Sequence, residues 1–275
     1  MADLPRAMPF PGPPAPNRLQ GLLRPVFGGL LDLIYPRLCC LCKVPVPLDA
    51  PRAGMRAWFC QPCADEVPWV EPPFCKVCGE MYDGAFTHDF RCMNCDGRRL
   101  AFDFAIAACR AEGPVRELVH QFKYERKLHL RGVLAALLLK TLDDPRLAGE
   151  DLATWRLVPV PLHRSREHDR EFNQSRELAL RLGQATGIPV SDALLRCRET
   201  DTQARLDREE RLQNLRGAFA LRRTRYRRRP PSLQGGRILL VDDVFTTGAT
   251  TSECARVLRQ EGGAEKVVVI TVARG

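Results

Sequence analysis

The sequence RILLVDDVFTTGATT at residues 237–251 decides the fold of this chain. Residues 237–241 are mostly apolar and partly β-branched, so they predict a short buried strand that is closed by two aspartates. Residues 252–260 have the hydrophobic spacing of a helix, and residues 267–272 form a second apolar run. Strand, turn, helix and strand in this order make a βαβ unit, which predicts an α/β fold with a parallel sheet.

The turn between that strand and helix has the composition of a phosphate-binding loop. Residues 246–251 offer backbone N–H groups at a helix start, several hydroxyls and a glycine that lets the chain wrap closely. Asp242 and Asp243 come just before it, where carboxylates bind hydroxyls or a metal ion beside a phosphate, so a phosphorylated sugar diol fits, with or without Mg²⁺. No Gly-Lys-Ser/Thr is present, which excludes a Walker P-loop. The alternative is an acidic turn in which Thr250 or Thr251 merely caps the helix.

Eight of the twelve cysteines form four Cys-x-x-Cys pairs near the start of the chain. The pairs are Cys39/Cys42, Cys60/Cys63, Cys75/Cys78 and Cys92/Cys95. Four thiolates close one tetrahedral site, so the set predicts two structural zinc ions. Sequential pairing, with the first two pairs on one zinc and the last two on the other, is the simplest arrangement. Interleaved pairing is the alternative, and disulfides or redox pairs are a third interpretation.

Three further cysteines are isolated, and we expect Cys109, Cys197 and Cys254 to be buried core thiols. With 275 residues and 45% apolar content, the chain can form one α/β domain and a smaller module. The net charge of +9 favours a polyanionic partner or substrate. The apolar stretch at residues 22–34 contains charges and is too short to span a bilayer, and no signal-peptide cleavage site follows it, so we expect a cytoplasmic protein without a membrane span.

The chain divides into four parts. Residues 1–18 are rich in proline and are expected to be disordered. Residues 19–38 predict an amphipathic helix that packs on the next module or, alternatively, contacts a membrane surface or partner. Residues 39–99 are the zinc-binding module. Residues 100–275 are the α/β domain, which includes a basic insertion at residues 222–231.

Basic residues follow the strand predicted at residues 156–163. Arg164, Arg166 and Arg170 are expected in a loop at the same sheet edge as the aspartates, where guanidinium groups suit a diphosphate. Arg211, from another loop, is a further candidate. The residues assigned to diphosphate binding are Pro159, Val160, Arg164, Arg170 and Arg211. A solvated charged loop is the alternative.

The run RRTRYRRR at residues 222–229 is the densest basic segment of the chain. Its arginines could hold phosphates and Tyr226 could stack on a base, which indicates a contact with single-stranded nucleic acid. A solvated loop is the alternative interpretation.

The stretch VDDVFTTGAT at residues 241–250 resembles the phosphoribosyl pyrophosphate (PRPP) motif of type I phosphoribosyltransferases. Together with the paired cysteines, three further blocks resemble the ComF family of competence-associated proteins, which join an N-terminal double zinc ribbon to a type I phosphoribosyltransferase fold. These blocks are VHQFKY at residues 119–124, VPVPLH through FNQ at residues 158–174, and residues 202–219. Glu171 departs from the family, which usually has glycine there.

The resemblance implies that Asp242 and Asp243 hold the ribose hydroxyls of Mg²⁺-PRPP. It assigns the 5′-phosphate to Thr246, Thr247, Gly248, Ala249, Thr250 and Thr251. It further implies a role in natural transformation, with incoming single-stranded DNA and a helicase or another competence protein as partners. The corresponding enzyme would be a phosphoribosyltransferase whose acceptor the sequence does not name. A non-catalytic sensor of PRPP or nucleotides, and a salvage-type enzyme unrelated to DNA, are the alternatives.

Overall fold

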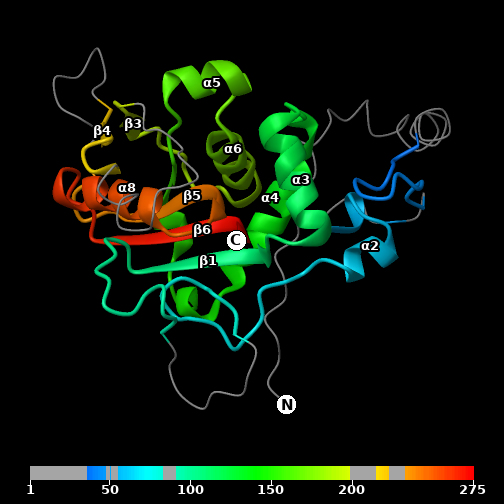
Figure 1. Ribbon diagram of the computed structural model, residues 1–275, viewed down its shortest axis with the longest axis horizontal. Coiled ribbons are helices and arrows are strands. Elements are labelled where there is room, and N and C mark those ends of the chain that lie inside the picture. Colours follow the sequence, from blue (N-terminus) through cyan, green and yellow to red (C-terminus); the bar gives the residue numbers. More distant parts are fainter. Residues whose placement is uncertain (1–35, 48–49, 51–54, 83–90, 199–214, 223–232) are drawn as a thin grey trace, which may run out of the picture.

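The computed structural model describes residues 36–47, 50, 55–82, 91–198, 215–222 and 233–275. A four-stranded parallel sheet lies at its centre, in the order β1-β6-β5-β2 (Figure 1). The strands are β1 (Phe104–Arg110), β2 (Arg156–Pro159), β5 (Arg237–Phe245) and β6 (Lys266–Arg274). This architecture confirms the predicted α/β fold with a parallel-sheet core.

Helices cover both faces of the sheet, as buried parallel strands require. Leu239 and Val241 of β5 pack on one side with helices α3 (Gly113–Tyr124), α4 (Arg131–Leu139) and α6 (Gln174–Thr186). Ile238 and Leu240 point to the other side, where they meet α8 (Ala249–Gln260) and the antiparallel pair β3 (Leu194–Arg196) and β4 (Phe219–Leu221). The remaining elements are α2 (Gln61–Asp65), α5 (Arg164–Arg170) and 3-10 helices at Met55–Ala57, Leu128–Leu130, Lys140–Asp143, Pro145–Leu147 and Leu152–Thr154.

Two elements differ from the sequence-based expectation. Strand β5 does not end at Val241 but continues to Phe245, because its ladder with β6 runs on to the pair Phe245 and Arg274 after β2 has ended. Both aspartates therefore lie inside the strand. Residues 164–170 form helix α5 and not a loop, since His163 caps the helix through its Nδ1, which accepts from the Ser165 backbone N–H at 3.4 Å.

The cysteine-rich segment shares both cores with the sheet. Cys39, Cys60 and Cys63 pack in the core that contains Phe59, on the α3 and α4 side, where the Trp58 ring occupies the space that a Cβ on Gly132 would need. The last four paired cysteines pack with Phe102 and Phe245 on the α8 side. Each half of the segment thus supports a different layer of the α/β domain.

Several sequence-based predictions fall outside the described residues. They are the tail at 1–18, the predicted helix up to residue 35, Arg211, and the basic insertion from residue 223 onward. At the end of that predicted helix, Leu38 forms an isolated antiparallel bridge with Pro45. Of the helices in the described ranges, none has the length and hydropathy needed to cross a membrane.

Candidate functional site

Asp242 and Asp243 lie near the carboxyl end of β5, and helices on one face of the sheet hold them separately. Asp243 Oδ1 is 2.8 Å from Nζ of Lys123 in α3. Asp242 Oδ1 accepts a hydrogen bond of 2.9 Å from Oγ of Ser175, in the first turn of α6. Burial acts to lower the pKa of Lys123, but the charge and hydrogen bond of Asp243, together with the charge of Asp242, outweigh burial and raise the pKa. The lysine is therefore a fixed cation against the acid pair.

Asp242 is the carboxyl group of this site that titrates near neutral pH. Desolvation, followed by the charge of Asp243, raises the pKa of Asp242 to about 7, against the opposing effects of Lys123 and Ser175. The folded protein therefore retains a proton on Asp242 well above the pH at which an unfolded chain loses it. The carboxylate form, which accepts hydrogen bonds through both oxygens, predominates only above neutral pH.

The loop at residues 246–251 has the backbone geometry of an anion-binding turn. Gly248 is the N-cap of α8 with φ of 72°, and a Cβ there would come within 2.6 Å of the Phe245 ring. Only glycine combines this left-handed conformation with so close an approach. The N-cap Gly248 has no side chain that could cap α8, and the Ala249 N–H donates to Thr247 Oγ1 at 3.4 Å. Thr251 donates its hydroxyl to the Gly248 carbonyl at 3.1 Å, so Thr251 is not a cap. The N–H groups of Thr250 and Thr251, in the same first turn, are placed for an anion.

The arginines of α5 differ in their relation to the acid pair. The Arg170 guanidinium lies 5.3 Å from the centre of the Tyr124 ring and donates to Gln174 Oε1 at 3.3 Å, whereas Arg164 is exposed at the helix start. Arg170 is also near enough to Lys123 to oppose the rise in its pKa. The described contacts thus place Arg170 near the acid pair and leave Arg164 at the exposed start of the helix.

The end of β2 is occupied by sheet and capping contacts. Val160 donates its N–H to the Val241 carbonyl at 2.9 Å, and Pro159 has no N–H. The side-chain amide of Asn173, the N-cap of α6, donates to the Val160 carbonyl at 3.1 Å. These contacts fix the start of α6, and with it Ser175, against the strand that carries the aspartates.

Glu171 ends α5 in the left-handed conformation, with φ of 67°. This backbone geometry gives a physical reason for a glycine at this position. The Glu171 carboxylate is directed to Arg126, 2.5 Å from its Nη1, in an exposed ion pair. The described partner of the Glu171 carboxylate is therefore Arg126.

Replacing Glu171 separates the backbone effect from the ion pair. Glu171→Ala should be the less stable variant, because it loses the exposed pair and keeps a side chain at positive φ. Glu171→Gly should be about 1 kcal/mol more stable than Glu171→Ala in urea unfolding, since glycine adopts this conformation without a Cβ penalty. Equal unfolding free energies for the two variants would contradict the backbone explanation.

The eight paired cysteines gather into two clusters with sequential pairing. Cys39, Cys42, Cys60 and Cys63 form one, and Cys75, Cys78, Cys92 and Cys95 form the other, with the four sulfur atoms of each within 4.8 Å of one another. Sequential pairing is therefore confirmed over interleaved pairing. Thiolates surround a tetrahedral zinc at this spacing, and four cysteines leave no open position, so both clusters fit structural zinc sites. Of the isolated cysteines, Cys109 and Cys254 are buried as expected, but Cys197 is exposed.

Residues that follow the second cysteine cluster contact the loop at residues 246–251 and the first turns of α8. Arg98, just after Cys95, donates through Nη1 to the Asn94 carbonyl at 3.0 Å and to the Thr247 carbonyl at 3.2 Å. The backbone N–H of Ala101 donates to Ser252 Oγ at 3.1 Å. The segment that carries the second cysteine cluster therefore holds the loop from outside the βαβ unit.

Lys123, Ser175 and Arg98 are the site residues that sequence reasoning did not assign. Lys123 lies within one block that resembles the ComF family, and Ser175 directly follows another. This proximity is the sequence feature that could have indicated them. Their partners are far away in sequence, so the ion pair and the hydrogen bond follow only from the packing of α3 and α6 on β5. For Arg98 the sequence offered no signal.

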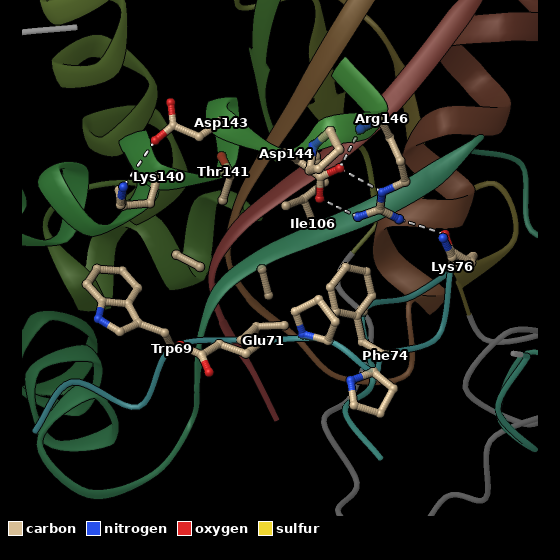
Figure 2. Close-up of a pocket in the computed structure, with 17 residues that line it drawn as sticks. Trp69, Glu71, Phe74, Lys76, Ile106, Lys140, Thr141, Asp143, Asp144 and Arg146 are labelled. Atoms are coloured by element: carbon tan, nitrogen blue, oxygen red, sulfur yellow. Dashed lines mark hydrogen bonds and ion pairs between the residues drawn. The ribbon is translucent and has the colours of Figure 1, made fainter. Parts of the chain in front are cut away.

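A cavity of about 810 Å³ lies apart from the acid pair, between residues 69–79 and strand β1 (Figure 2). Trp69, Phe74 and Ile106 line its apolar part, and the pairs Lys140–Asp143 and Arg146–Asp144 lie at its border. Neither aspartate of β5 nor the loop that follows contributes to its wall. The cavity is therefore not the site predicted from the sequence.

Comparisons with known proteins agree with this combination of modules. Residues 30–96 match the family model described as "Double zinc ribbon domain". The chain is 29% identical over 221 residues to "Competence protein F" of Haemophilus influenzae, which covers 78% of this chain and 90% of that protein. It is 31% identical over 235 residues to "DNA utilization protein YhgH" of Escherichia coli K12. This match covers 84% of this chain and 95% of that protein. "Competence protein ComFC" of Bacillus subtilis is 35% identical over 118 residues, which are 43% of this chain and 44% of that protein.

The fold and the site define an α/β protein with a type I phosphoribosyltransferase fold and an N-terminal double zinc ribbon. The chain belongs to the ComF family of competence proteins.

Proposed function

We propose that this chain binds Mg²⁺-PRPP at the end of β5 and uses this site in the handling of single-stranded DNA during natural transformation. The observation that carries the proposal is the acid pair inside β5, followed at once by an anion-binding turn without a side-chain cap. Such a pair and turn match a ligand that has a diol beside a phosphate.

In the proposed complex, the hydroxyls of the ribose bind Asp242 and Asp243, and the 5′-phosphate binds residues 246–251. Thr246 is exposed and Thr247 is partly exposed, so their hydroxyls can turn toward a phosphate. Lys123 already contacts Asp243 and is the cation that the described contacts place nearest to the diphosphate. Mg²⁺ would arrive with the diphosphate and neutralise part of its charge.

The names of the relatives support the DNA part of the proposal. One relative is a "DNA utilization protein" and two are named competence proteins. The net charge of +9 is consistent with a polyanionic partner. We extend the proposal to a cytoplasmic location and to a helicase or another competence protein as partner.

A PRPP-dependent sensor is the second candidate, and the chemistry of the acid pair favours it over an enzyme. Within the described ranges, the side chains that contact the pair are Lys123 and Ser175, and both act as donors. Neither is suited to remove a proton from an acceptor, and Asp242, whose pKa is about 7, is bound to the ribose hydroxyls in the proposed complex. As an enzyme, the protein would rely on positioning and on charge neutralisation of the departing diphosphate.

Calorimetric titration with Mg²⁺-PRPP tests binding, and diphosphate release in the presence of candidate bases or amines separates the two candidates. We expect saturable binding at one site per chain. Release of diphosphate that depends on an acceptor would establish a phosphoribosyltransferase, and binding without release would establish a sensor. An absence of binding heat and of any ligand-induced rise in thermal stability would contradict both.

Affinity for PRPP should increase with pH through the titration of Asp242. The pKa near 7 means that Asp242 is mostly protonated at pH 6 and mostly ionised at pH 8. A carboxylate accepts a ligand hydroxyl better than a carboxylic acid does, so the affinity should rise roughly tenfold over this range. Titrations of wild type and Asp242→Asn at both pH values check this. The variant lacks the titrating carboxyl group at position 242, so any pH dependence that it keeps comes from the phosphate groups of the ligand. Equal pH dependence in the two proteins would contradict the assignment.

A further inference from the structure

An exposed aromatic pair stands on α3 beside the acid pair. Tyr124 is 63% exposed, and its ring lies 4.9 Å from that of His120, one turn earlier in the helix. Both belong to the VHQFKY block at residues 119–124, whose lysine binds Asp243. The proposed PRPP site gives no task to either ring.

The position of this pair is fixed by a packed support beneath it. Phe122 of α3 is fully buried, and its ring packs against Phe172 at 5.1 Å between centres, in the connection from α5 to α6. Arg170 reaches back from the end of α5 to the Tyr124 ring and is held by Gln174 of α6. Figure 1 shows α3, α5 and α6 on the same side of the sheet. Tyr124 is therefore an exposed ring on a rigid base.

Arg170 differs from the other cations near Tyr124 in its partners. Arg126 is paired with Glu171, and Lys127 is paired with Glu125 at 2.9 Å. Within the part of the chain that the structure describes, Arg170 has neutral partners only, the Tyr124 ring and the Gln174 amide. Its positive charge is thus left for an anion beside the ring.

We infer that Tyr124, with His120 and Arg170, is a stacking platform for an unpaired nucleobase at the entrance of the acid-pair site. An exposed ring accepts the face of any base, and a guanidinium beside it suits the adjoining phosphate. The ligand is a nucleotide unit, either free or within a single strand. This inference rests on the proposed function for its biological setting, because the platform would place a base next to the bound PRPP.

The probes are an oligothymidylate of about 8 nucleotides, the same backbone with abasic units, and thymidine monophosphate. Wild type should bind the oligothymidylate more tightly than the abasic strand. Tyr124→Ser should weaken oligothymidylate binding about 5- to 150-fold, the range for one base–aromatic stack, and leave abasic binding unchanged. Tyr124→Phe is the matched control and should retain most of the affinity, since it keeps the ring. If thymidine monophosphate shows the same Tyr124 dependence and competes with the strand, the ligand is the free nucleotide.

The salt dependence distinguishes stacking from charge. Tyr124→Ser should keep the wild-type slope of log affinity against log salt, because no phosphate contact is lost. Equal affinity of wild type for the oligothymidylate and the abasic strand would overturn the inference, and so would unchanged oligothymidylate binding in Tyr124→Ser.

Two further measurements keep the inference separate from the proposed PRPP site. The thermal midpoint of Tyr124→Ser should match wild type, since the side chain is exposed. Its Mg²⁺-PRPP affinity should match as well. Tyr124-dependent base binding without any PRPP binding would contradict the proposed function and support the platform, and the reverse result would do the opposite.

Discussion

Asp242→Asn should weaken the binding of Mg²⁺-PRPP about 10- to 150-fold at pH 8, the range expected for one hydrogen bond to a charged group. The neutral amide cannot replace the carboxylate as an acceptor through both oxygens. The variant should remain folded, because Ser175 can still donate to the amide oxygen and a desolvated carboxyl group has been removed. Calorimetric titration measures the affinity, and the thermal midpoint reports the fold. Unchanged affinity in a folded Asp242→Asn protein would sink the assignment.

The neighbouring Asp243 needs a different design, because its side chain neutralises Lys123. In Asp243→Asn the largely buried ammonium loses its partner, which should reduce the unfolding free energy by up to about 3 kcal/mol. A loss of affinity in that variant alone would be ambiguous. The variant that combines Lys123→Met with Asp243→Asn removes both charges and should recover much of the stability. We expect it to bind Mg²⁺-PRPP weakly even when folded, because it lacks the charged hydroxyl acceptor at position 243 and a cation for the diphosphate.

The sequence predicted the parts of the site that are local. The residues from Asp242 to Thr251 are contiguous, so their composition alone indicated a strand, an anion-binding turn and a helix. The predicted zinc-ligand sets are also local, because two Cys-x-x-Cys pairs within about 25 residues suffice for one set. For the same reason Gly248 could be recognised before its φ was known.

The parts of the site that sequence reasoning missed depend on tertiary packing. Lys123 reaches Asp243 only because α3 packs on the same face of the sheet as α6, and nothing near residue 123 specifies that contact. The length of β5 was underestimated because charged residues usually end a buried strand, whereas here the ladder with β6 continues past them. The separate zinc module was an approximation, since each cysteine cluster shares a core with the α/β domain.

Removal of zinc should have the largest effect on stability. Structural sites of this kind contribute apparent binding energies of about 10–16 kcal/mol in small peptides, which is comparable to the whole stability of a typical domain. Elemental analysis should find two zinc ions per chain in the purified protein. Treatment with a strong chelator should lower the thermal midpoint by 10 °C or more, on the order expected when several kcal/mol are lost from a domain of this size. Full stability after complete zinc loss would contradict a structural role.

The two cysteine clusters should differ in their effect on PRPP, because the segment that carries the second cluster contacts the turn at residues 246–251 through Arg98. Cys42→Ser and Cys92→Ser each remove one ligand, and each should leave about one zinc ion per chain. Cys42→Ser weakens the support beneath α3 and α4, whereas Cys92→Ser also releases Arg98 from the Thr247 carbonyl and Ala101 from Ser252. At a temperature where both are folded, we expect the larger loss of Mg²⁺-PRPP affinity in Cys92→Ser.

Two controls decide whether this difference comes from the contact with the turn. Cys197→Ser replaces an exposed cysteine outside both clusters and should change neither the zinc content nor the affinity. Arg98→Ala removes the hydrogen bond to Thr247 while all eight cysteines remain, so it should keep two zinc ions and reproduce part of the loss in Cys92→Ser. Equal affinities in Cys42→Ser and Cys92→Ser, or wild-type affinity in Arg98→Ala, would show that the second cluster stabilises the fold without organising the turn.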